Sequence, residues 1–154
     1  RAAIQAYTVG KRIALIEQRE MIGGVCINPG TIPSKTFREA VLHLSGDQYQ
    51  SIYGINYRVK DKITMADLAF RVQHVIKTEI DVTQAQLSRN NIELMMGTAS
   101  FLDKNTVRVT NSRGIQDYQA ATIVIATGTK PAASPSVPLN NKTIISGDGI
   151  REMA

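Results

Sequence analysis

Residues 23–35 constrain the fold more than any other part of this chain. The segment reads Gly-Gly-Val-Cys-Ile-Asn-Pro-Gly-Thr-Ile-Pro-Ser-Lys and holds three glycines, two prolines, a lysine and the single cysteine of the chain. Glycine permits positive φ and a close approach of backbone to a ligand, and Pro33 suits the first turn of a helix whose free N–H groups point outward. We interpret the segment as a loop that holds a ligand against backbone, between an apolar strand ending at Glu17 and a helix over 34–45.

The residues before this loop are typical of a dinucleotide-binding unit. Residues 1–7 have the character of a helix interior, and residues 11–17 form a short apolar run that ends in Glu17. In a βαβ unit the acid that ends the second strand accepts hydrogen bonds from the adenosine ribose. The alternative is a solvent-facing glutamate. We expect the Gly-x-Gly-x-x-Gly turn and the first strand to lie upstream of Arg1, which would make this chain a fragment.

The loop also carries a specific resemblance. Gly-Gly-x-Cys-x-x-x-Gly-x-x-Pro-Ser-Lys resembles the flavin-facing segment of the pyridine nucleotide disulfide oxidoreductases, in which a second cysteine follows the first after four residues. Thr31 stands at that second place. A threonine hydroxyl forms no disulfide and the chain has no other cysteine, so dithiol chemistry is excluded here. In this respect the segment is similar to the soluble, FAD-containing pyridine nucleotide transhydrogenases, which have the fold of the disulfide reductases without the disulfide.

The resemblance implies an α/β fold, a Rossmann-like three-layer FAD-binding domain with an inserted antiparallel β-meander. Residues 1–154 would be a fragment of that domain, without the NAD(P)-binding and dimerisation domains. It further implies FAD as cofactor, NAD(P)H as substrate and a homo-oligomeric full-length protein. Carried over position by position, it gives Cys26 and Lys35 as catalytic residues, and as cofactor-binding residues Glu17, Gly23, Gly24, Cys26, Thr31, Lys35, Gly97, Ala99, Ala126, Thr127 and Gly128.

Lys35 follows the glycine-rich loop at the start of the predicted helix. With a helix beginning near Ser34, a lysine on the first turn opposes the helix dipole, so we expect something to compensate its charge. In the family that the loop resembles, the matching lysine lies beside the reactive flavin nitrogen and stabilises negative charge on the reduced flavin. An exposed surface lysine is the alternative. For Cys26 the sequence leaves open a low-pKa thiolate and an inert buried thiol.

The rest of the chain predicts further elements in the order that the family implies. Thr64-x-x-Asp67 indicates a capping box that opens a helix to about residue 90, with His74 close to its buried stripe. Strands and turns alternate over 92–119, which indicates an antiparallel meander, with the main chain at 97–99 passing the adenine or forming a plain strand bend. The apolar run 122–129 predicts a central parallel strand ending in Ala-Thr-Gly, and 143–150 resembles a second strand and turn.

Composition excludes several classes of protein. With 43% hydrophobic and 20% charged residues among 154, the chain is typical of a globular domain, and no apolar run is long enough for a membrane span. The net charge of +5 is scattered, without basic runs, so we expect no nucleic-acid partner. His43 and His74 have no ligand-spaced partners, so we predict no metal site. A single cysteine favours a cytoplasmic protein.

These observations predict an oxidoreductase that transfers hydride between NADPH and NAD through FAD, that is, an NAD(P)+ transhydrogenase. A flavin-dependent NAD(P)H oxidoreductase with another acceptor, such as a quinone or oxygen, stays open, as does a relative of dihydrolipoamide dehydrogenase. In a different class, the chain by itself would be a non-catalytic FAD-domain fragment that turns over nothing.

Overall fold

The computed structural model describes residues 1–28, 30–132, 134–140 and 142–149. The chain divides into two compact units. The first consists of Arg1–Ile22 and Ile80–Thr127, and the second of Gly23–Glu79 with the residues described from Gly128 onward. Among the described helices, none combines the length and the apolar character that crossing a membrane requires. Pro29 in the glycine-rich loop and Ile150 in the last expected strand lie outside the described residues.

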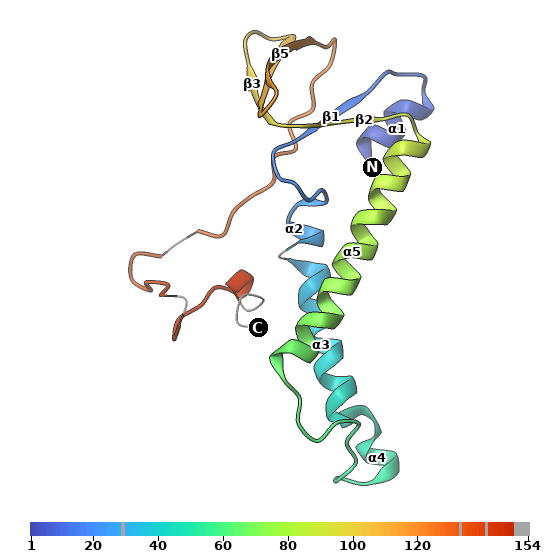
Figure 1. The fold of residues 1–154 in the computed structure, drawn as a ribbon, viewed down its shortest axis with the longest axis vertical. Helices are drawn as coiled ribbons and strands as arrows, with labels where there is room; N and C mark the ends of the chain where they lie inside the picture. The colour runs from blue at the N-terminus through green and yellow to red at the C-terminus, as the bar shows by residue number, and fades with distance from the viewer. Residues whose placement is uncertain (29, 133, 141, 150–154) are drawn as a thin grey trace. The chain divides into compact units, whose positions relative to one another are not determined.

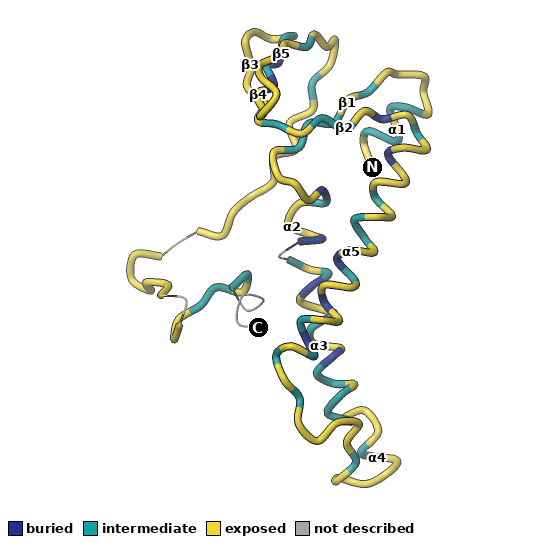
Figure 2. Tube along the Cα trace, in the orientation of Figure 1, coloured by how far each residue is buried: buried dark blue, intermediate teal, exposed yellow. Residues whose placement is uncertain are grey.

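The first unit contains a small parallel sheet. Helix α1 (Ala2–Thr8) precedes strand β1 (Ala14–Glu17), which pairs with strand β2 (Glu93–Met96) so that Ala14 faces Glu93 and Glu17 faces Met96 (Figure 1). Ile22, Leu87 and Ile92 form its buried core (Figure 2). Residues packed on that core come from both sides of the glycine-rich loop in sequence: Ala3, Ile4, Ile13, Leu15, Ile80 and Leu94. The predicted strand ending in Glu17 is therefore confirmed.

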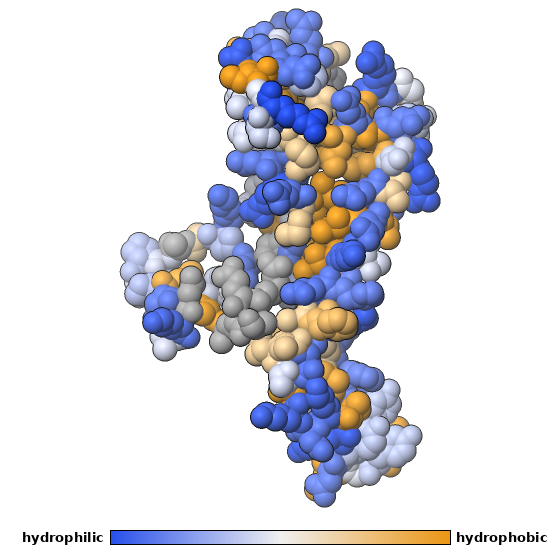
Figure 3. All heavy atoms as spheres, viewed as in Figure 1, coloured by the Kyte–Doolittle hydropathy of each residue, from blue (hydrophilic) through white to orange (hydrophobic). Residues whose placement is uncertain are grey.

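The same unit carries the antiparallel meander that the sequence predicts. Strands β3 (Thr98–Phe101), β4 (Thr106–Asn111) and β5 (Gly114–Gln119) follow in order. Alternate residues of β4 point inward, with Val107 and Val109 buried, as expected for a strand with one covered face. The face of the meander drawn in Figure 3 is mostly hydrophilic. The meander begins one strand later than predicted, because β2 pairs with β1 instead.

The second unit is helical where it is regular. Helix α2 (Gly24–Ile27) and helix α3 (Thr31–Ser45) lie next to each other in sequence and in contact, followed by the 3₁₀ turn η1 (Asp47–Tyr49) and helix α4 (Gln50–Tyr53). The prediction of an open loop over 23–33 is wrong in part. A short helix occupies its middle, and α3 begins at Thr31, three residues before the predicted start.

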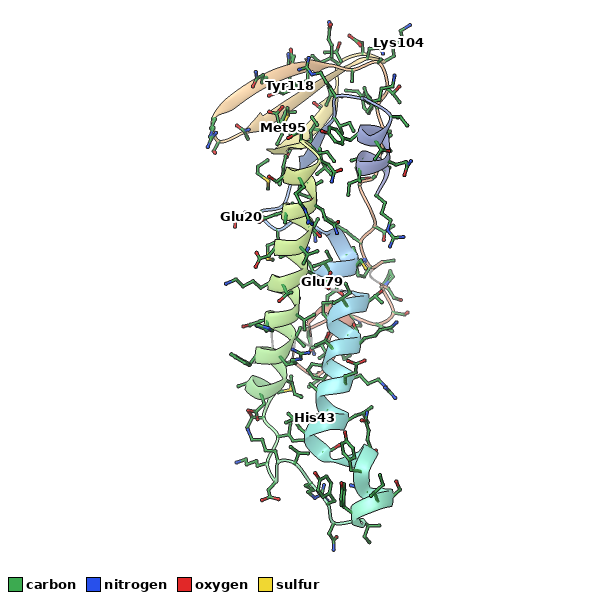
Figure 4. The ribbon with its side chains drawn as sticks, turned by 90° about the vertical axis from the view of Figure 1, so that its right-hand side faces the viewer. Glu20, His43, Glu79, Met95, Lys104 and Tyr118 are labelled. Carbon is green, nitrogen blue, oxygen red and sulfur yellow. The ribbon has the colours of Figure 1, made fainter. Side chains whose placement is uncertain are left out.

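Helix α5 (Met65–Arg89) begins with the predicted capping box. The backbone N–H of Thr64 donates to Asp67 Oδ2 at 2.9 Å, and the backbone N–H of Asp67 donates to Thr64 Oγ1 at 3.3 Å. Leu68, Val72 and Ile76 form the buried stripe of its N-terminal half, which lies alongside α3 in Figures 1 and 4.

His74 is exposed, so the prediction that it lies close to the buried stripe is wrong. It follows the buried Val72 by two positions, about 200° around the helix, which carries it to the opposite face. His43, labelled on α3 in Figure 4, is also exposed.

The predicted central strand over 122–129 is not formed. These residues are irregular chain, with Val124 72% and Ile125 70% exposed. A strand needs a neighbour whose backbone groups pair with its own, and the described sheet that contains β1 has only the two strands β1 and β2. Apolar composition alone therefore does not make this run a strand. Residues 142–149 likewise form no strand and contain a short 3₁₀ turn at 147–149.

Candidate functional site

The carboxyl ends of β1 and β2 bring two predicted site residues together. The backbone N–H of Gly97 donates to the carbonyl oxygen of Glu17 at 2.9 Å, directly after the paired residues Glu17 and Met96. The Glu17 side chain turns back on its own loop, where Oε1 accepts a 3.0 Å hydrogen bond from the backbone N–H of Arg19. Ligands of open α/β sheets bind outside the carboxyl ends of the strands. Glu17 and Gly97 lie at that position.

The packing of the chain against β4 requires a glycine at position 97. A Cβ built on it would lie 2.8 Å from Val109 Cγ1 and 2.9 Å from the carbonyl oxygen of Thr110. Only glycine therefore lets the chain pass from β2 into β3 so close to β4. Ala99 follows on β3, where it pairs with Val109 and is exposed. The close approach at Gly97 is to β4, and a role of 97–99 toward a ligand stays a prediction.

A pocket of about 490 Å³ opens beside these strand ends. Its lining residues, six of which have polar side chains, come from the loop after β1, the β2–β3 crossing and the end of β4: Gln18, Glu20, Met96, Gly97, Thr98, Thr110, Asn111 and Ser112. Figure 4 shows Glu20 on the loop after β1. Of the residues predicted from sequence, only Gly97 lines this pocket, while Glu17 adjoins Gln18.

Gln18, Glu20, Asn111 and Ser112 line the pocket but are not among the residues predicted from the sequence. For the first two a signal existed, because residues that follow a strand-end acid lie at the ligand-binding edge of the sheet. Asn111 and Ser112 come to the same edge only through the pairing of β4 with β3, which no local pattern reveals.

The Cys26 segment belongs to the second unit. Cys26 lies on α2 and is exposed, and Gly23, with φ of 105°, is the N-cap of that helix. The backbone N–H of Gly30 donates to the carbonyl oxygen of Val25 at 2.6 Å and so closes the turn between α2 and α3. Thr31 is the first residue of α3 and is exposed. The alternative of an inert buried thiol does not apply to this structure.

Lys35 is exposed and is the fifth residue of α3. The prediction that it lies on the first turn is wrong, because the helix begins at Thr31. The dipole acts mainly within the first turn, so the charge of Lys35 needs no compensation on that ground. Its role beside a flavin stays a prediction from the motif.

Ala126, Thr127 and Gly128 are exposed in the irregular chain after the meander. Gly128 has φ of 71°, which a residue with a side chain rarely adopts. None of the three lines the strand-end pocket. The structure thus brings Glu17 and Gly97 together, joins Cys26 to the start of α3 through the 25–30 bond, and leaves 126–128 without a place in either group.

An acid at the carboxyl end of a parallel strand, at the edge of the sheet where ligands bind, is characteristic of dinucleotide-binding α/β proteins. The model of the pyridine nucleotide-disulphide oxidoreductase family matches residues 1–152, and the chain belongs to that family. The predicted family and fold class are confirmed.

Curated relatives extend this result. The chain is 45% identical over 155 residues to a soluble pyridine nucleotide transhydrogenase of Mycobacterium tuberculosis strain H37Ra, with 99% of this chain and 33% of the relative covered. A protein of the same name from Yersinia pestis strain Pestoides F is 36% identical over 154 residues, with 99% and 33% covered. The chain thus spans about a third of the length of these relatives.

Solved structures agree on the fold. LpdA of Mycobacterium tuberculosis superposes with a TM-score of 0.79 at 19% identity, over 97% of this chain and 33% of that one. The HOCl-induced flavoprotein disulfide reductase RclA of Escherichia coli gives a TM-score of 0.72 at 26% identity, over 97% of this chain and 30% of that one.

Proposed function

We propose that this chain is the FAD-binding part of an NAD(P)+ transhydrogenase that passes hydride between NADPH and NAD without a redox disulfide. One observation carries the proposal. Thr31 occupies the place of the second cysteine in a chain that is 45% identical to a protein named soluble pyridine nucleotide transhydrogenase. With one thiol at this site, there is no disulfide to accept the reducing equivalents from the flavin. They leave instead by transfer to a second nucleotide.

The strand-end pocket suits the adenosine end of a dinucleotide. Its lining offers the Gln18 amide, the Glu20 carboxylate and the Thr98, Thr110 and Ser112 hydroxyls. One Glu17 carboxylate oxygen is held by the Arg19 backbone N–H, which fixes the orientation of the carboxylate. A carboxylate held in this way is suited to accept from the two hydroxyls of a ribose.

In the second unit, the exposed α2–α3 segment would face the reacting end of the cofactor. FAD, when bound, supplies the hydride chemistry. Lys35 would hold a positive charge near the ring where negative charge develops, and Gly23 and Gly24 would leave space for it. Cys26 would contact the ring without exchanging electrons. Ala126, Thr127 and Gly128 would contribute backbone to the same cofactor.

The test uses the complete protein under anaerobic conditions. It is mixed with NADPH and a spectrally distinct NAD analogue, and the flavin absorbance and analogue reduction are followed together. We expect the analogue to be reduced while the flavin cycles. Flavin that bleaches with the analogue untouched would contradict the proposal and point to another acceptor, such as a quinone or oxygen.

Two variants sharpen the test. Lys35→Met should slow flavin reduction by NADPH, while Arg38→Met, which removes an exposed charge one turn further along α3, should leave it unchanged. A complete protein that binds no flavin would contradict the proposal in favour of a non-catalytic module. We also propose that the complete protein is a cytoplasmic homo-oligomer, which light scattering during gel filtration and cell fractionation would test.

A further inference from the structure

The peptide unit between Met96 and Gly97 is held from both sides. Its N–H, on Gly97, donates to the carbonyl oxygen of Glu17 at 2.9 Å. Its carbonyl oxygen, on Met96, accepts a 2.9 Å hydrogen bond from Asn111 Nδ2 at the end of β4. Both residues of this peptide line the strand-end pocket, as does Asn111. The orientation of the pocket wall is therefore set by β1 on one side and by a single side chain on the other.

Asn111 also holds its own hairpin turn. Its Oδ1 accepts a 2.9 Å hydrogen bond from the backbone N–H of Arg113, across the two-residue loop that joins β4 to β5. The side chain thus needs one acceptor and one donor at the same time. Asparagine supplies both, whereas aspartate supplies only acceptors.

We propose that Asn111 is a positioning residue for the adenosine half of the dinucleotide. It fixes the Met96–Gly97 peptide and, through the turn, the pocket-lining Ser112. The inference rests on the proposed function, because it takes FAD as the ligand of this pocket. It adds to that function a residue that reaches the site from the meander, 94 positions after Glu17 in the sequence.

The test compares two variants with a matched control in the complete protein. Asn111→Asp keeps the acceptor for Arg113 and replaces the donor to Met96 by a charged oxygen. Asn111→Ser keeps an acceptor in the turn, adds no charge and is too short to reach Met96. Asn105→Asp is the control, because Asn105 Nδ2 donates to the carbonyl oxygen of Ala120 at 2.9 Å. That bond ties two ends of the meander together, and Asn105 does not line the pocket.

The flavin is removed, and dissociation constants for FAD and for ADP, which carries the adenosine half, are measured by titration. Loss of one hydrogen bond that orients the site predicts about five- to tenfold weaker binding of both ligands by the Asn111 variants. Asn105→Asp should stay within about twofold of the wild type, with a similar unfolding midpoint. At saturating FAD, Asn105→Asp should reduce its flavin at the wild-type rate, since Asn105 does not line the pocket.

Each outcome has one meaning. Asn111 variants that bind FAD and ADP as tightly as the wild type overturn the inference and leave the proposed function standing. Equal losses in Asn111→Asp and Asn105→Asp overturn it too, since the effect would then belong to the stability of the meander. A wild-type protein that fails to rebind FAD overturns the proposed function and this inference together.

Discussion

The carboxylate of Asp67 receives three hydrogen bonds at the start of α5. Lys60 Nζ donates at 2.6 Å, the Thr64 backbone N–H at 2.9 Å and Thr64 Oγ1 at 2.8 Å. These bonds lower the pKa of Asp67 from 3.8 to about 2, and the hydrogen bond from Lys60 has the largest effect. A lowered pKa in the folded state means that this stabilisation is complete above about pH 4 and is lost as the pH falls through about 2.

Replacing Lys60→Met should therefore raise the pKa of Asp67 toward 3.8, because the hydrogen bond with the largest effect is removed. The pKa is measured by NMR titration of the Asp67 carboxyl carbon. Lys62→Met is the control for the loss of a nearby positive charge. An unchanged pKa in the Lys60 variant would show that the bonds from Thr64 are sufficient.

Cys26 is exposed on α2 and has Thr31 where a disulfide partner would stand. Because a thiol without a partner stores no electron pair as a disulfide, Cys26→Ser should keep the transhydrogenation rate within about threefold of the wild type. Stopped-flow rates of analogue reduction measure it. A near-total loss of activity would mean that the thiolate itself takes part in the reaction.

At the scale of elements, the β2–β3 crossing depends on Gly97. Adding a methyl group there forces an overlap with Val109, a buried residue of β4, and with the Thr110 carbonyl. We expect Gly97→Ala to destabilise the protein by roughly 1 to 3 kcal/mol, the usual cost of overpacking. Denaturant unfolding measures the change.

Gly147→Ala is the matched control, since nothing lies within 4 Å of a Cβ at that position. Its unfolding midpoint should match that of the wild type. If Gly97→Ala is equally neutral, the crossing relaxes without cost and the close approach is not a constraint.

Elements with local signals could be predicted from the sequence, and those that depend on distant partners could not. The capping residues Thr64 and Asp67 indicate the start of α5. Turn residues between the strands likewise indicate the meander. The run 122–129 has the composition of a buried strand, but pairing is decided by a neighbouring backbone, so Val124 and Ile125 are exposed. The sequence predicts the start of α3 three residues too late, because Gly30 is typical of a loop and Thr31 and Ile32 carry no helix signal of their own. Pro33 does lie within the first turn, as its fixed φ favours.

The candidate site follows the same rule. Glu17 and Gly97 were predicted from strand-end position and from the resemblance, and their hydrogen bond brings them to one edge. Asn111 reaches the pocket through the pairing of β4 with β3, so the sequence on either side of residue 111 does not predict its contribution. The roles of Cys26, Lys35 and 126–128 toward a cofactor stay predictions.

At the scale of the whole molecule, the 154-residue chain presents an apolar run to solvent. Val124 and Ile125 are adjacent and more than two-thirds exposed. Contiguous exposed apolar residues bind hydrophobic probes and promote association. The chain made by itself should therefore bind a hydrophobic dye, and Val124→Thr with Ile125→Thr should reduce the dye fluorescence.

Phe70→Thr is the control for this prediction. Phe70 is 75% exposed on α5, but as a single residue on a helix. Its replacement should change the dye signal less than the paired substitution does. An equal or larger effect of Phe70→Thr would place the dye on α5 instead of the 122–129 run.

The exposed thiol of Cys26 on α2 also gives the chain a single site for thiol-specific labelling. Because the 154 residues contain one cysteine, a maleimide fluorophore or nitroxide would attach at Cys26 alone. If the isoalloxazine ring lies beside α2, added FAD would quench that fluorophore and slow its attachment. The label on Cys26 would then report whether FAD is bound.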